Sequence, residues 1–176
     1  MIFSEEKHDT QSFQVRRGFR RGAAQVREIN MPTYVVTAAA GRLSQQQKND
    51  LAASITRIHC AVTGAPAYFA QVLFNDVSEG NYFIAGKPLS EDIVFIHGQI
   101  RSGRGLDIKQ RIILEMLEAT AAIAEMERSH VQIYLVELPA KQIAEWGRIL
   151  PDPDEEAEWI ASIPTHVKKR MDDLLS

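Results

Sequence analysis

A chain of 176 residues, 45% of them hydrophobic, is long enough for one compact domain with a sizeable core and short for two. Its 20 basic and 23 acidic residues give a formal net charge of -3, so we expect no nucleic-acid or membrane partner. The single cysteine, Cys60, excludes an internal disulfide and a cysteine-rich metal site, which fits a cytoplasmic location. No apolar run approaches the roughly 18 to 20 residues that span a bilayer, and the start lacks the order of a secretory signal.

Residues 1–30 differ in composition from the rest of the chain. Residues 14–21 are arginine-rich without a helical or strand period, which predicts a disordered leader. Acidic residues within the segment argue against an organelle-targeting peptide. The alternative is a mis-assigned start, with translation beginning at Met31, because Arg27 and Glu28 can be encoded by a purine-rich run that resembles a ribosome-binding site.

After this segment the pattern becomes regular. Residues 34–37 are β-branched and aromatic, as in a strand. Ser44 followed by Gln47 is a capping-box pattern for a helix start, and the glycine and proline of 64–66 end that helix. Residues 69–74 are predicted as the next strand. The apolar residues of the helix recur at steps of three and four and form one face: Leu51, Ile55, Ile58 and Val62.

The second half repeats this order. Strands are predicted over 93–100 and 131–138, with a helix over 107–126 between them. A shift of 62 residues superposes the two halves and aligns Gly41 with Gly103, Leu51 with Ile113, Ile55 with Leu117 and Val72 with Tyr134. The chain therefore holds two tandem βαβ units.

Two such units predict an α/β (α+β) fold in which a four-stranded sheet has both long helices on one face. The other face lacks a cover, so we expect an oligomer. The predicted domain spans 31–164, with units at about 31–77 and 93–138, and residues 165–176 form a C-terminal tail.

Three smaller elements complete the prediction. Residues 82–84 are expected to form a short hairpin arm. Residues 139–146 are expected to start a last short helix after the final strand, since proline is tolerated at a first helical position. Residues 151–176 have the spacing of a weakly amphipathic helix, which we interpret as packing.

Arg101 and Arg104 lie in a glycine-containing turn between a strand end and a helix start. Two guanidinium groups at this spacing suit a small carboxylate substrate, because each can bind a carboxylate through two hydrogen bonds. The helix start adds backbone N–H groups. The alternative is a solvated basic loop.

Three further residues are candidates for chemistry. His59, near the end of the first helix, could donate a hydrogen bond to a carboxylate, or it could be a structural histidine; no ligand spacing around it indicates a metal. Glu145 stands beside apolar residues, which could raise its pKa toward that of a general base, or it could be a surface glutamate. Tyr134 lies in the last predicted strand and could equally be a core tyrosine.

Pro32 opens the first strand directly after Met31. If translation starts at Met31, removal of that methionine exposes a secondary amine that can give or take a proton at a substrate. With residues 1–30 attached, Pro32 is an amide without a basic nitrogen. A proline at a strand edge is the alternative interpretation.

Five stretches of the sequence together carry a family resemblance: Pro32–Tyr34, Ala70–Phe74, Phe95–Gly98, Ile100–Arg104 and Glu145–Pro151. From Pro32 to about Pro164, the chain resembles the tautomerase superfamily and, within it, the cis-3-chloroacrylic acid dehalogenase group. The resemblance implies a homotrimer without a metal or organic cofactor. It assigns the group's functional residues to Pro32, Glu145 and Tyr134 (catalysis) and to His59, Arg101 and Arg104 (substrate binding). Trp146 stands where a tyrosine is expected.

The resemblance implies a hydratase or dehalogenase of small 3-halo or acetylenic unsaturated carboxylic acids. In that mechanism the arginines and His59 hold the carboxylate, Glu145 with Tyr134 activates a water that attacks C3, and Pro32 protonates C2. One alternative is a keto–enol tautomerase of 2-oxo acids in which Pro32 acts as the base. Another is a non-catalytic trimeric binding protein in which Pro32 is blocked.

Overall fold

The computed structural model describes residues 32–89 and 92–176. The predicted leader, residues 1–30, lies outside the described residues. The first half contains β1 (Thr33–Ala39), α1 (Gln45–Thr63), a 3₁₀ turn η1 (Ala67–Phe69), β2 (Gln71–Val77), β3 (Phe83–Ile84) and β4 (Lys87–Pro88). The second half contains β5 (Val94–Arg101), α2 (Leu106–Ile123), η2 (Arg128–His130) and β6 (Val131–Leu138). The C-terminal segment contains η3 (Ala140–Gln142), β7 (Ala144–Glu145), β8 (Arg148–Ile149), η4 (Pro153–Glu155), α3 (Glu156–Ala161) and α4 (Thr165–Asp173).

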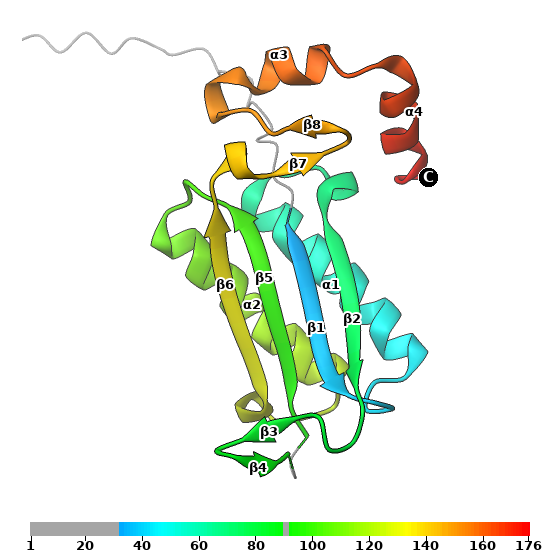
Figure 1. The fold of residues 1–176 in the computed structure, drawn as a ribbon, viewed down its shortest axis with the longest axis vertical. Helices are drawn as coiled ribbons and strands as arrows, with labels where there is room; N and C mark the ends of the chain where they lie inside the picture. The colour runs from blue at the N-terminus through cyan, green and yellow to red at the C-terminus, as the bar shows by residue number, and fades with distance from the viewer. Residues whose placement is uncertain (1–31, 90–91) are drawn as a thin grey trace, which may run out of the picture.

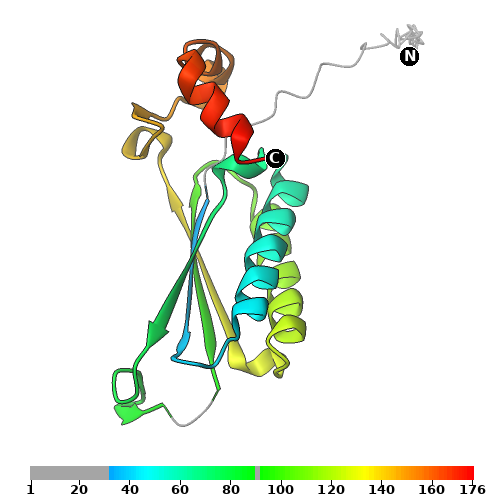
Figure 2. The ribbon, with the colours of Figure 1, turned by 90° about the vertical axis from the view of Figure 1, so that its right-hand side faces the viewer.

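The predicted four-stranded sheet is confirmed, with strand order β2-β1-β5-β6. Each βαβ unit pairs its strands in parallel, and the two units meet through the antiparallel pair of β1 and β5. Both long helices cover one face of the sheet, and no described helix or strand covers the opposite face (Figure 2). The hairpin of β3 and β4 lies at one end of the sheet, whereas β7, β8 and α3 lie at the other (Figure 1).

Local signals explain the first helix. Ser44 accepts the backbone N–H of Gln47, and the Gln47 side chain accepts the backbone N–H of Ser44, as the capping box predicts. Gly64 ends the helix in the left-handed conformation, with φ of 77°. Phe69 belongs to η1 and not to β2, so the second strand begins later than predicted.

The main core lies between the sheet and the two helices. Leu51 and Ile55 of α1 are buried there, and their counterparts on α2 are Ile112 and Met116. The repeat is therefore offset by one residue in the helices from the alignment that the sequence predicts. The reason is that Ile113 and Leu117 sit one position away from the buried face of α2.

A second, smaller core joins the C-terminal segment to the end of the sheet. Its buried residues are Phe69, Ala140, Leu150, Trp159, Ile163, Val167 and Met171. Val167 and Met171 belong to α4, so this helix packs against the segment that precedes it. None of the helices in the described ranges has both the length and the hydropathy of a membrane span.

Candidate active site

Pro32, Arg101 and Arg104 belong to the same end of the sheet. Because β1 and β5 are antiparallel, the start of β1 meets the end of β5: Thr33 pairs with Gln99. Pro32 therefore precedes β1 at the edge where Arg101 ends β5. Pro32 is buried, and its carbonyl accepts the backbone N–H of Gln71 at 2.9 Å.

His59 projects from the last part of α1 into the buried layer below this edge. Its Nδ1 lies 2.8 Å from the hydroxyl of Tyr34, and both side chains are fully buried. Gly98 makes room for this pair, because Tyr34 lies opposite it in the sheet. A Cβ atom on Gly98 would come within 2.5 Å of Tyr34 Cε1.

Burial and, second, the nearby charge of Arg104 lower the pKa of His59 to about 3, so the imidazole is neutral near neutral pH. Burial also raises the pKa of Tyr34, so its hydroxyl stays protonated and can donate a hydrogen bond to Nδ1 of His59. The hydrogen of the neutral ring then resides on Nε2. That atom is buried and has no hydrogen-bond partner within residues 32–89 and 92–176. Nε2–H of His59 can therefore donate a hydrogen bond to an oxygen of a bound molecule.

Arg101 and Arg104 flank a tight turn between β5 and α2. Gly103 adopts φ of 110° there, a conformation that only glycine reaches without strain. Arg104 donates its backbone N–H to Glu137 at 3.4 Å, while its positive charge acts on both Tyr34 and His59.

Arg101 forms a buried ion pair that the sequence analysis missed. Its guanidinium contacts the carboxylate of Glu156, and only 6% and 1% of the two side chains are exposed. Glu156 is the first residue of α3. Its position in an acidic run, 55 residues from Arg101, carries no local signal of this contact. The C-terminal segment therefore fixes one of the two candidate carboxylate-binding arginines.

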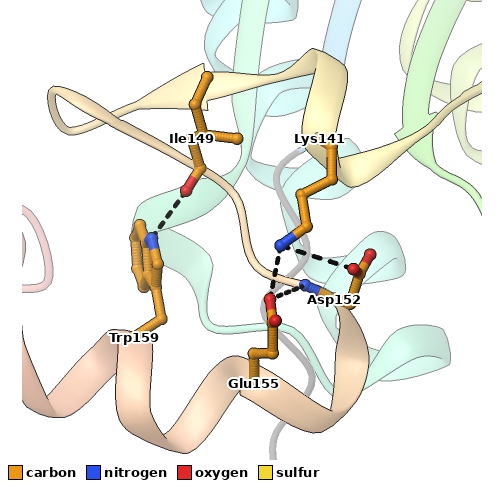
Figure 3. A network of polar contacts seen from close by, with 5 residues as sticks. All are labelled: Lys141, Ile149, Asp152, Glu155 and Trp159. Atoms are coloured by element: carbon orange, nitrogen blue, oxygen red, sulfur yellow. Dashed lines mark hydrogen bonds and ion pairs between the residues drawn. The ribbon is translucent and has the colours of Figure 1, made fainter.

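Polar contacts hold this C-terminal segment in place (Figure 3). Lys141 contacts the carboxylates of Asp152, the residue before η4, and Glu155, the last residue of η4. The Trp159 indole donates to the carbonyl of Ile149 at 2.8 Å. These contacts connect α3 to the β7–β8 hairpin, so Glu156 and Glu145 belong to one anchored unit.

Glu145 lies on a hairpin and not on the helix expected over 139–146. That segment forms only the short turn η3 and then β7, because Ile143 and Trp146 pack against the second core. Glu145 pairs with Arg148 across a two-residue turn in which Trp146 and Gly147 both have positive φ, at 53° and 78°. This turn geometry matches the twist of a hairpin.

A cavity of about 430 Å³ opens beside Glu145. Burial raises the pKa of Glu145 to about 7, which is the range of a general base or acid at neutral pH. Gln71, whose N–H binds the Pro32 carbonyl, also lines the cavity. The cavity therefore adjoins the sheet edge that carries Pro32.

Tyr134 lies apart from the other candidates within one chain. It pairs with His97 in the middle of the sheet, stacks edge-on against Phe95 at 5.0 Å and is 63% exposed on the uncovered face. The cavity that it lines contains Phe83 and Ile84 of the β3–β4 hairpin and not Glu145.

The candidate site thus contains Glu145, a carboxyl group of raised pKa, and His59, a neutral hydrogen-bond donor. It also contains the two arginines Arg101 and Arg104. In the described part of the chain, no three His, Cys, Asp or Glu side chains gather as a metal site would require. The chemistry that these side chains can themselves perform is proton transfer beside a bound carboxylate.

Comparison with known proteins identifies the family of this chain. A family model described as "Putative oxalocrotonate tautomerase enzyme" matches residues 31–162. The crystal structure of N1, a member of the cis-3-chloroacrylic acid dehalogenase family, is 33% identical and has a TM-score of 0.73. The match covers 80% of this chain and 99% of N1. This chain belongs to the cis-3-chloroacrylic acid dehalogenase group of the tautomerase superfamily.

Other structures of this tautomerase fold are also similar. Native Ps01740 is 34% identical with a TM-score of 0.61, and the match covers 64% of this chain and 99% of that one. An asymmetric trimer of wild-type fused 4-OT is 19% identical with a TM-score of 0.62, over 66% of this chain and 94% of that one. At that identity the likeness is one of fold. No curated protein matches this tautomerase-superfamily chain.

Proposed function

We propose that the chain, once it begins at Pro32, is a cofactor-independent hydratase and dehalogenase of small 3-halo or acetylenic unsaturated acids. The observation that carries the proposal is Glu145, whose pKa of about 7 and position beside the cavity suit a base that activates water. Keto–enol tautomerisation with Pro32 as the base needs no activated water. The presence of a second base, Glu145, therefore favours hydration.

In the proposed mechanism the substrate carboxylate binds at Arg104 and His59. Nε2 of His59 donates a hydrogen bond, and Arg104 supplies positive charge where enediolate character develops. The charge of Arg101 is compensated by Glu156, so Arg104 supplies most of the positive field here.

Glu145 then takes a proton from water, the hydroxide attacks C3, and the protonated Pro32 amine gives its proton to C2. With a 3-haloacrylate the adduct is a halohydrin, which collapses to malonate semialdehyde, halide and a proton. This sequence requires Pro32 to be a free amine, because an amide nitrogen has no proton to deliver.

We further propose a homotrimer, in which subunits cover one another's open sheet faces. Leu73, Tyr134 and Val136 leave large apolar surfaces on that face, at 48%, 63% and 41% exposure. In that assembly Tyr134 would act in the site of a neighbouring subunit, since it is remote from Glu145 in its own. The similar fused 4-OT protein is a trimer, which supports this arrangement.

A keto–enol tautomerase of 2-oxo acids is the second candidate, because the matching family is described as one of oxalocrotonate tautomerases. Glu145→Gln separates the two functions. It should lower hydration of a 3-haloacrylate by roughly a hundredfold or more, while phenylpyruvate tautomerisation falls much less.

Both assays use one trimeric preparation whose intact mass starts at Pro32, with Glu158→Gln, an exposed glutamate on α3, as the control. Equal losses in both reactions would favour the tautomerase. A native protein whose mass includes residues 1–30 would instead favour a non-catalytic binding protein.

A further inference from the structure

The cavity beside Glu145 contains more than the proposed reaction needs. Its walls come from η1, β2, the β7–β8 turn and α4. The lining side chains with polar or aromatic groups are Tyr68, Gln71, Glu145, Trp146 and Arg170. At about 430 Å³ it lies in the range of sites for much larger ligands, roughly 300 to 1,000 Å³, so a three-carbon acid would leave most of it unused.

Arg170 provides a positive charge at the wall of this cavity. Its guanidinium carbon lies 5.6 Å from the centroid of the Trp146 ring, a cation–π contact. Over the described ranges, Arg170 forms no ion pair with a carboxylate. Burial alone accounts for the raised pKa of Glu145, so Arg170 is not that residue's counter-charge. The guanidinium is thus available to an anion that enters the cavity.

Trp146 is a fixed platform for this arginine. A non-glycine residue with φ of 53° is uncommon, and here the two-residue turn of the hairpin enforces it. The helix α4, which carries Arg170, is anchored through buried Val167 and Met171. Figures 1 and 2 show α4 at the end of the sheet where the β7–β8 hairpin lies. Both partners of the cation–π contact therefore come from packed elements.

We propose that Arg170 is a specificity-determining residue that binds a second anionic group at the far end of the substrate. The substrate class is then an unsaturated acid with a distal carboxylate, longer than a three-carbon acid. The inference rests on the proposed function, which places the reacting carbons between Pro32 and Glu145 and the first carboxylate at Arg104 and His59.

The test compares two 3-halo unsaturated acids of equal length, one ending in a carboxylate and the other in the neutral carboxamide. The Pro32-starting protein should prefer the diacid by about tenfold in kcat/KM, the size of one charge-assisted hydrogen bond. Arg170→Ala should abolish that preference, and Arg170→Lys should retain part of it. Lys169→Ala is the matched control, because Lys169 is an exposed cation on the same helix outside the cavity. It should keep the full preference.

A second readout does not depend on turnover. Calorimetric binding of the saturated diacid and its carboxamide to the same variants should show the same dependence on Arg170. If the parent hydrates a 3-haloacrylate but treats the two long acids alike in both assays, the inference is overturned and the proposed function stands. If no hydration occurs yet the saturated diacid binds through Arg170, the anion site is supported and the proposed reaction fails.

Discussion

Replacing Glu156 by Gln tests the buried ion pair that connects α3 to the candidate site. The exposed fractions of Arg101 and Glu156, 6% and 1%, place the pair in the regime where losing one partner costs about 3–5 kcal/mol. Glutamine preserves the volume, and its amide oxygen can still accept one hydrogen bond from Arg101. We therefore expect a loss near the lower end, about 3 kcal/mol. A typical domain, with about 5–15 kcal/mol of stability, survives such a loss.

The assay is urea unfolding followed by the fluorescence of the two tryptophans, at one fixed protomer concentration because assembly contributes to stability. Glu158→Gln on the same helix is the matched control and should change the stability by less than about 0.5 kcal/mol. The double variant Arg101→Met/Glu156→Met removes both charges and should recover most of the loss. An unchanged urea midpoint in Glu156→Gln would refute the argument, because Arg101 would then not depend on this carboxylate.

Three further predictions concern Glu145 and the buried contact between Tyr34 and His59. Hydration should increase with pH through about 7, because only ionised Glu145 can accept a proton from water; a kcat/KM profile without this limb in the parent would contradict that role. The same raised pKa should make the folded state less stable as the pH rises from 4.5 to about 7, because in this range folded Glu145 keeps a proton that the unfolded chain has released. Urea unfolding across this range checks the sign. Gly98→Ala should cost about 1–3 kcal/mol and raise KM, since the added methyl displaces Tyr34 from His59; thermal unfolding and KM values matching the parent would show that this contact can relax.

The fold was predictable from the sequence because its signals are local. Ser44 and Gln47 cap α1 through atoms three residues apart, and Gly64 supplies the left-handed conformation that ends it. The apolar residues that recur at steps of three and four along α1 predicted which face of that helix packs against the sheet. The expected helix over 139–146 was wrong because packing of Ile143 and Trp146 against distant residues decided that segment.

The sequence by itself determined two βαβ units, the layer arrangement and the residue types of the proposed carboxylate-binding, proton-transferring site, because hydrogen-bonding and hydropathy patterns depend on neighbouring positions. Only the tertiary structure decided how those residues are held and ionised. It buried His59 against Tyr34, paired Arg101 with Glu156 and raised the pKa of Glu145, because desolvation and charge contacts depend on which distant segments meet. It also placed Tyr134 opposite His97 in the sheet, in a different cavity from Glu145, although the two residues are close in the sequence.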